Sequence, residues 1–234
     1  MQIDTLYHLS RADAPKVVRI LLESFRDDPL YRKLIPEEDL RDKTLPEVFA
    51  CDAGELLEND DAFADGPDVN GLIIVDDDSE PYNHLKFFSV ETFYAWKTNV
   101  SLIKDDISLK TLWHFLRARQ FLNADWTEEL PAKQYIHIIY FAVRPGARGT
   151  GMAHKVIGPV LRYADQKGLL VSLETHNEKN LPMYQHYGFE LHATLETPFD
   201  LLQYCMVRKP GTLPLDPAKG SEIPPPSVTE RGGV

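Results

Sequence analysis

The sequence has little cysteine, no long apolar run and fewer basic than acidic residues. Its 234 residues include only two cysteines, Cys51 and Cys205, which are too few for a disulfide framework. No stretch reaches the roughly 18 apolar residues that span a membrane, and residues 1–16 lack the basic start and apolar core of a secretory signal. We therefore expect a cytoplasmic protein with no membrane partner.

Basic residues are scarce, which argues against nucleic acid as a partner. The 25 Lys and Arg face 36 Asp and Glu, a net charge of −11, whereas nucleic-acid binding needs clustered cations to neutralise phosphates. The acidity is concentrated in residues 36–80, where 16 acidic residues stand against two basic ones. One strongly acidic segment is thus joined to a nearly neutral remainder, and we expect the two to have different roles.

Three motifs of other enzyme classes are also missing. No lysine follows Gly151 in the spacing of a P-loop, which disfavours a nucleoside triphosphatase. No Gly-x-Ser-x-Gly turn is present for a serine hydrolase. The histidines and cysteines do not recur at His-x-x-x-His or Cys-x-x-Cys spacing, so we infer no metal site.

The sequence does have the composition of a globular domain, with 43% hydrophobic and 26% charged residues. We expect one domain over residues 1–209. Residues 81–130 are expected to form a helical insert, in which Ser108 caps a helix with one apolar face. Residues 210–234 hold six prolines and four glycines among few apolar groups, and we expect a disordered C-terminal tail there.

Hydrophobic periodicity predicts the remaining elements. Alternation and short apolar runs predict strands, and an apolar face recurring every three or four residues predicts helices. Strands are expected at 3–9, 71–75, 135–143, 169–175 and in a last pair from 189 to 207. Helices are expected from Asp13 onward and at 46–57, 151–166 and 180–187. This succession predicts the α/β (α+β) class, with a mixed sheet flanked by helices.

A glycine-rich turn at 144–151 joins the strand 135–143 to the next helix. Its glycines permit close approach of the backbone to a ligand, and the first helical turn leaves amide groups without partners. Residues 144–167 carry five basic residues and one acidic residue, a local charge of +4. These features favour an anion site, most naturally for a pyrophosphate. An ordinary connection between strand and helix is the alternative.

Two motifs in this region resemble the signatures of the GNAT superfamily of N-acetyltransferases. The run Arg148-Gly149-Thr150-Gly151-Met152-Ala153 matches the pattern Arg/Gln-x-x-Gly-x-Gly/Ala. Further along, Asn180 is followed by Tyr184 and by Gly188-Phe189, which is similar to the second signature. The residues around Leu173-Glu174-Thr175 resemble the small-molecule, puromycin N-acetyltransferase-like branch of bacteria and fungi. The resemblance covers about residues 135–192 and implies a GNAT-type, mostly antiparallel central sheet.

The resemblance implies acetyl-CoA as the co-substrate, with its acetyl group passed directly to an amine and no metal involved. It implies that the amides of Arg148, Gly149, Thr150, Gly151, Met152 and Ala153 bind the pyrophosphate. The backbone of Phe141, Ala142 and Val143 would pair with the pantetheine arm like an added strand, and Asn180 would steady that arm. Tyr184 matches the family's general acid. A phenol with a pKa of about 10 can protonate the departing thiolate while it stays neutral beforehand.

Two residues compete for the role of general base. An alkyl amine is mostly protonated at neutral pH, so a base must take its proton before attack. His137 occupies the position where some relatives carry a catalytic Glu, and histidine titrates in the useful range. Glu174, at the end of the neighbouring strand, is the other candidate, directly or through water. For both residues a packing or orienting role in the sheet is the alternative.

The acceptor is expected to be a small-molecule primary amine, because the helical insert at 81–130 favours an enclosed pocket. A protein lysine or N-terminus is the alternative acceptor, and a non-catalytic CoA-binding module is the alternative function. The chain is expected to act as a monomer or homodimer. We also hypothesise that acidic residues of the segment 36–80 border the acceptor entrance and attract cationic amines.

Overall fold

Seven strands form one sheet in a computed structural model that describes residues 1–80, 84–118, 124–132, 134–197 and 199–212. The predicted tail at 210–234 lies outside these residues from 213 onward. The sheet order is β1-β2-β3-β4-β5-β7-β6. The strands are β1 (Tyr7–His8), β2 (Asp61–Ala64), β3 (Gly71–Asp77), β4 (Tyr135–Val143), β5 (Leu170–Thr175), β6 (Glu190–Thr197) and β7 (Leu201–Arg208).

The pairing is antiparallel throughout except between β4 and β5, which run parallel. Those two strands are joined through a helix, as a parallel connection requires. The fold is therefore the mixed, mostly antiparallel sheet flanked by helices that the sequence predicts.

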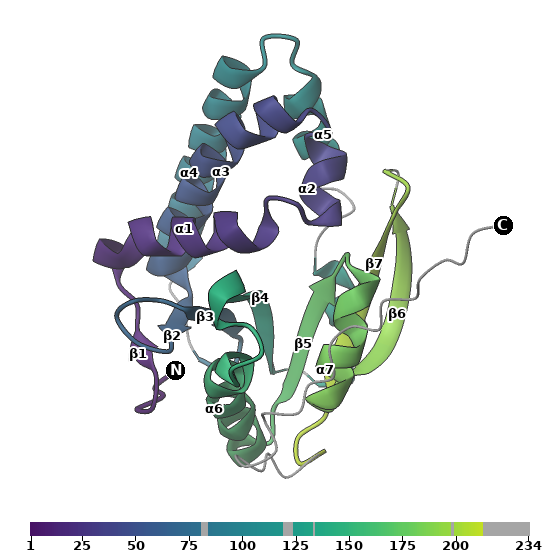
Figure 1. Cartoon of the computed structure of the whole chain (residues 1–234). Helices are drawn as coiled ribbons and strands as arrows, with labels where there is room; N and C mark the ends of the chain where they lie inside the picture. The colour runs from purple at the N-terminus through teal and green to yellow at the C-terminus, as the bar shows by residue number, and fades with distance from the viewer. Residues whose placement is uncertain (81–83, 119–123, 133, 198, 213–234) are drawn as a thin grey trace, which may run out of the picture.

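Helices cover both faces of this sheet (Figure 1). One apolar cluster joins the sheet to α6 and α7, and another joins the opposite face to α1, α2 and α3. Helices α4 and α5 pack beside α3 and α2, so these four form a helical region beyond α1, at the far end of the molecule from α6 (Figure 1). The helices are α1 (Ala14–Phe25), α2 (Pro29–Leu34), α3 (Glu38–Asn59), α4 (His84–Asp105), α5 (Lys110–Ala118), α6 (Met152–Lys167) and α7 (Leu181–His186), with short 3-10 turns η1 (Arg11–Asp13), η2 (Asp125–Glu129), η3 (Pro145–Ala147) and η4 (Glu178–Asn180).

Most predicted elements are present, and two differ in extent. The first strand is reduced to two paired residues, because a hydrogen bond from the amide of Leu6 to the carbonyl of Ile3 closes a turn before it. Helix α3 begins eight residues before the predicted start at Pro46, and that proline lies inside it. Proline removes one helical hydrogen bond. The helix continues past Pro46 because Leu45 and Phe49 beside it are fully buried, and their packing stabilises it.

The last strand, β7, is tied to α6 by an ion pair whose arginine is fully buried. The guanidinium of Arg208, on β7, has no exposed surface and donates to both carboxylate oxygens of Asp165 at 2.7 and 2.9 Å. Its Nε also donates to the carbonyl of Tyr187 at 3.0 Å. Burial alone would raise the pKa of Asp165, but the hydrogen bonds from Arg208 and from the amide of Gly211 outweigh it and lower that pKa.

We predict that Asp165→Asn lowers the free energy of unfolding by about 3 kcal/mol, because it leaves the Arg208 charge buried without its partner. The folded-state pKa of Asp165 lies below its unfolded value, so the pair stabilises the fold above about pH 4 and loses this effect as the pH falls through the lowered pKa. Denaturant unfolding from acidic to neutral pH measures both effects. Asp68→Asn, at an exposed loop position, is the control. Equal stability of the two variants at neutral pH would contradict the prediction.

Candidate active site

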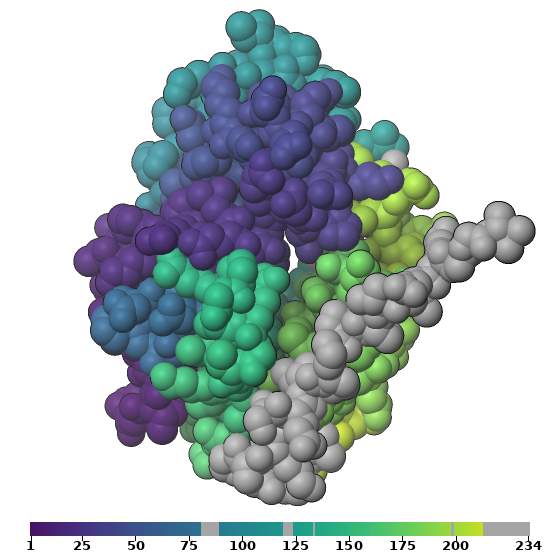
Figure 2. Space-filling model, viewed as in Figure 1, coloured from purple at the N-terminus to yellow at the C-terminus, as the bar shows by residue number. Residues whose placement is uncertain are grey.

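The parallel strands β4 and β5 separate after four paired residues. Their register runs from Tyr135↔Leu170 to Ile138↔Leu173 and stops there. On its other side β4 stays paired with β3 as far as Val143↔Gly71, with one extra residue, Ile139, at a bulge. A bulge bends its strand, and here it marks the point of separation. Beyond Ile138, β4 therefore has no strand partner toward β5 within the described chain, and Figure 2 shows the surface hollowed between α1, α6 and α7.

The predicted anion turn follows β4 directly. Gly149 and Gly151 adopt positive φ angles of 76° and 79°, and Gly151 is the N-cap of α6. Within the described residues, no protein group accepts a hydrogen bond from the amides of the run Gly149–Ala153. The side chain of Arg148 ties the turn to β4 by donating from Nε to the carbonyl of Val143 at 3.1 Å. The turn thus presents unpaired amides at a helix start, which is the arrangement that binds phosphate groups.

Asn180 is the N-cap of α7, and Tyr184 lies within that helix. The side-chain amide of Asn180 donates to Thr175 Oγ1, at the end of β5, at 3.2 Å. Tyr184 is 7% exposed, and its ring lies 6.4 Å from that of Phe141 on β4, centre to centre. Burial raises the pKa of Tyr184, and the charge of Asp28 raises it further. The phenol is therefore held protonated beside the open edge of β4.

The two candidate bases contact each other. His137 Nε2 lies 3.0 Å from Glu174 Oε2, and His137 Nδ1 lies 2.9 Å from Ser172 Oγ. The indole of Trp126 donates to the second oxygen of Glu174. Because side chains alternate along β4, His137 points to the opposite face from Ile136 and Ile138, which pack in the cluster that contains Tyr184. The base pair and the tyrosine therefore face opposite sides of the sheet, next to the point where β4 and β5 separate.

A second polar network on this face was not predicted from the sequence. Tyr140 Oη donates to Asp52 Oδ2 on α3 at 2.8 Å, and Tyr31 Oη on α2 lies 3.1 Å from Tyr140 Oη. The bulge at Ile139 inserts one residue, so Tyr140 points to the same face as His137. The only sequence signal for this network was that Asp52 and Glu55 lie one helical turn apart, on the same side of α3. Nothing in the sequence pairs Tyr140 with α3.

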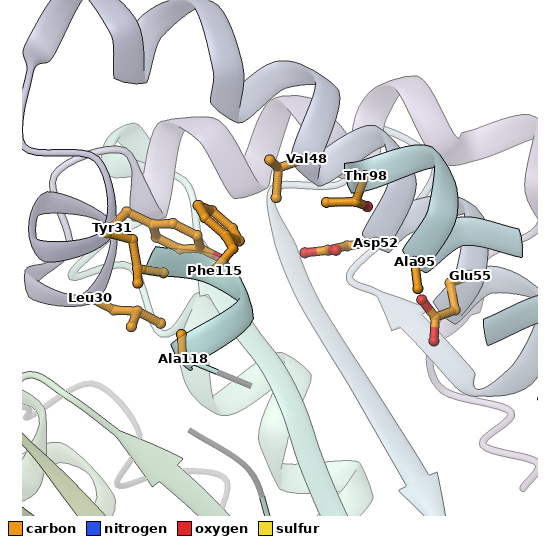
Figure 3. A pocket seen from close by; sticks show the side chains of 10 residues that line it. Leu30, Tyr31, Val48, Asp52, Glu55, Ala95, Thr98, Phe115 and Ala118 are labelled. Carbon is orange, nitrogen blue, oxygen red and sulfur yellow. The ribbon is translucent and has the colours of Figure 1, made fainter. Parts of the chain in front are cut away.

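A cavity of about 200 Å³ adjoins this network, between α2, α3, α4 and α5 (Figure 3). The residues of α2 and α5 that line it are mainly apolar or aromatic, and those of α3 and α4 include two carboxylates and a hydroxyl. In Figure 3 the carboxylate of Asp52 points across the cavity toward the rings of Tyr31 and Phe115. Both acids that line it, Asp52 and Glu55, belong to the acidic segment 36–80.

Neither a metal site nor a membrane helix is found in the described part of the chain. No group of three or more His, Cys, Asp or Glu residues there could hold a metal ion. None of the helices there combines the length and the apolar character needed to cross a membrane.

The chain belongs to the GNAT family of acetyltransferases. Residues 73–189 match the model of the Acetyltransferase (GNAT) family, which confirms the resemblance seen in the sequence motifs. An uncharacterized N-acetyltransferase of Schizosaccharomyces pombe is 29% identical over 83 residues. That match covers 32% of this chain and 32% of the relative, so it spans about a third of the relative's length.

Solved structures of acetyltransferases share the fold. A histone acetyltransferase HPA2 and related acetyltransferase from Corynebacterium glutamicum superposes with a TM-score of 0.56 at 17% identity, covering 90% of this chain and 97% of that one. The arylalkylamine N-acetyltransferase 2 of Aedes aegypti superposes with a TM-score of 0.51 at 15% identity, covering 87% and 97%. The chain therefore contains a GNAT acetyltransferase domain, and this family generally uses acetyl-CoA.

The residues present fit that co-substrate. Gly149 and Gly151 have no described atom within 4 Å of the position a Cβ would take, so the space above the turn is open. The unpaired amides of the turn suit phosphate oxygens, and the free edge of β4 suits an extended amide-containing chain.

We predict that Gly151→Ala weakens the binding of CoA. A non-glycine residue at a φ of 79° costs about 1–2 kcal/mol, and relaxing that strain turns the amides of the turn away from a bound pyrophosphate. We expect the Kd for CoA, measured by calorimetry, to rise about tenfold. Gly66→Ala is the control, since Gly66 also has open space around it but has no positive φ. A Kd equal to that of the control would contradict the role of the turn.

Proposed function

We propose that the protein transfers the acetyl group of acetyl-CoA directly to a primary amine of a small molecule. The observation that carries the proposal is the opening between β4 and β5, which has a protonated tyrosine on one face and a His–Glu pair on the other. A reaction that protonates a leaving thiolate and deprotonates an attacking amine needs an acid and a base, and the opening offers one of each.

Two backbone segments would hold the co-substrate. The amides of Arg148–Ala153 would bind the pyrophosphate, and the backbone of Phe141, Ala142 and Val143 would pair with the pantetheine arm along the free edge of β4. Asn180, which is held at the end of β5 by Thr175, would steady the same arm. Acetyl-CoA supplies the acetyl group as a thioester, whose carbon accepts the amine nitrogen as the carbon–sulfur bond breaks.

Tyr184 acts as the general acid. A tyrosine hydroxyl keeps its proton at neutral pH, and burial and the charge of Asp28 raise the pKa of this one further. The ring of Tyr184 lies 6.4 Å from that of Phe141, centre to centre, so the tyrosine is next to the strand that would receive pantetheine. Tyr184 therefore gives its proton to the departing sulfur and is re-protonated from solvent.

The His137–Glu174 pair acts as one base. Both nitrogens of His137 have partners, Glu174 and Ser172, so the imidazole and the carboxylate form one hydrogen-bonded unit. The protonated amine gives one proton to this pair before attack and a second as the amide forms, and the pair passes both to solvent. Solvent returns one proton to Tyr184, which has protonated the thiolate, so the reaction releases one proton overall. The sequence left His137 and Glu174 as alternatives, and their 3.0 Å contact supports a joint role.

The cavity beside Asp52 supports a small acceptor. It lies under the helices α4 and α5, in the region where the sequence predicted an enclosing insert. The structural relatives include an arylalkylamine enzyme and a histone enzyme by name, so the shared fold alone leaves both acceptor classes open. A cavity of about 200 Å³ has room for a few carbon and nitrogen atoms and favours the small amine.

We predict that Tyr184→Phe lowers kcat by about 100-fold or more, because general acid catalysis is lost. The Kd for CoA should not change, since the ring remains. Tyr187→Phe is a matched control, because the buried Tyr187 hydroxyl has no hydrogen-bond partner in the described chain and its removal should leave kcat unchanged. Thiol release from acetyl-CoA measures the rate. Unchanged turnover in Tyr184→Phe would remove its role.

We also predict that His137→Ala and Glu174→Gln each lower kcat/KM and that the double variant is no slower than the slower single variant. Residues that act as one unit show such non-additivity. Each single variant should also weaken the fall of kcat/KM at low pH, which reports protonation of the base. Ser172→Ala removes the contact of His137 Nδ1 but leaves its contact with Glu174, so this variant should retain most activity. Additive losses, or an unchanged pH profile in both variants, would show that the pair is not the base.

A further inference from the structure

The cavity between α2 and α5 has one acidic side and one apolar side. Asp52 and Glu55 contribute carboxylates from α3, and both are half-buried. Leu30, Phe115 and Ala118 form the opposite wall (Figure 3). A half-buried carboxylate beside aromatic and aliphatic walls is the environment that suits an ammonium group on a hydrocarbon chain.

A directed hydrogen-bond chain connects the acidic side to β4. Tyr140 has a single hydroxyl proton and donates it to Asp52, so the contact of 3.1 Å between the two tyrosines has Tyr31 as donor. Burial raises the pKa of both tyrosines well above 10, and the charge of Asp52 contributes to both shifts. Both hydroxyls therefore stay protonated, and the chain orients the Asp52 carboxylate at the edge of the cavity.

The position of Tyr140 relates the cavity to the reaction. Tyr140 precedes Phe141, the first of the residues whose backbone would pair with pantetheine, and it shares a face of β4 with His137. The cavity extends from Tyr31 and Asp52 away from the strand, to Glu55, Ala95 and Thr98. Because Asp52 lines the cavity and accepts from Tyr140, the cavity lies one side chain away from β4, which suits the far end of an acceptor whose reacting amine lies at that strand.

The surface of α4 next to the cavity also has an aromatic and an acidic side chain. A second, open hollow on α4 shares Ala95 with the cavity and is lined by Glu91 and Trp96. Trp96 is 62% exposed, so an aromatic face and a carboxylate lie at the surface next to the cavity. Both groups attract cations.

We infer that the cavity binds the second, non-reacting ammonium group of a straight-chain aliphatic diamine, with Asp52 as its counter-ion and the apolar wall against its methylene groups. This inference rests on the proposed function, because it names the class of amine that the same active site accepts. It gives Asp52 and Glu55 of α3 a defined role in recognition.

The test compares straight-chain diamines with the monoamines of equal length. In the wild type, kcat/KM should be between about 10- and 100-fold higher for a diamine than for its monoamine, as expected for one charge-assisted hydrogen bond. Asp52→Asn should abolish this preference through a higher KM for the diamine, while kcat with the monoamine stays near the wild-type value. The asparagine oxygen can still accept from Tyr140, so the tyrosine chain is retained.

Two further variants make the result decisive. Asp39→Asn removes one exposed charge from the first turn of α3 and should keep the diamine preference, which separates local binding from general charge steering. Glu55→Gln provides a second test at the cavity if Asp52→Asn does not fold, and it should reduce the preference. Calorimetric binding of CoA verifies that each variant is folded.

Each outcome supports or overturns the inference. Loss of the diamine preference in the cavity variants alone supports it. Equal kcat/KM for diamines and monoamines in the wild type overturns it while leaving the proposed function intact, and so does a preference that persists in both cavity variants. CoA binding without turnover of any amine would instead overturn the proposed function, and the inference with it.

Discussion

The proposed active site depends on one constraint, the early end of the parallel pairing between β4 and β5. Four residues of each strand are paired, and the bulge at Ile139 then lets β4 follow β3 while β5 follows β7. A sheet interior normally hides its backbone groups in hydrogen bonds, but this separation exposes a free strand edge in the middle of the sheet. The glycine turn, α7 and the His–Glu pair all lie around that opening, so the geometry of the site follows from it.

The two sides of the opening have different electrostatics. The segment 144–167 carries a local charge of +4 and presents unpaired amides at the start of α6, which suits the anionic co-substrate. The acidic segment 36–80 places Asp52 and Glu55 at a cavity on the opposite face of the sheet. The net charge of −11 therefore combines two regions of opposite sign. In the proposed reaction each region faces a substrate of opposite charge, so an anion and a cation can approach the same strand without competing.

Local patterns predicted six of the seven strands, all but β2, and the glycine-rich turn, because their signals lie in adjacent residues. β4 has the predicted bounds Tyr135–Val143, and the glycines of the turn sit at the positive φ angles that only glycine adopts easily. Contacts between distant residues were not predictable in the same way. His137 and Glu174 meet through a parallel register, and Tyr140 reaches Asp52 across 88 positions of sequence. The bulge that turns Tyr140 toward α3 leaves no sequence signal, so this second network needed the structure.

Hydrogen exchange with and without CoA measures most directly whether the opening holds the co-substrate. The free edge of β4 and the turn should be the protected regions, since backbone amides are the groups that would bind pantetheine and pyrophosphate. We predict that CoA slows exchange at Phe141, Val143 and the run Gly149–Ala153, and leaves the β6–β7 pair unchanged. Bound CoA that protects none of these amides would contradict the assignment of the opening as the active site.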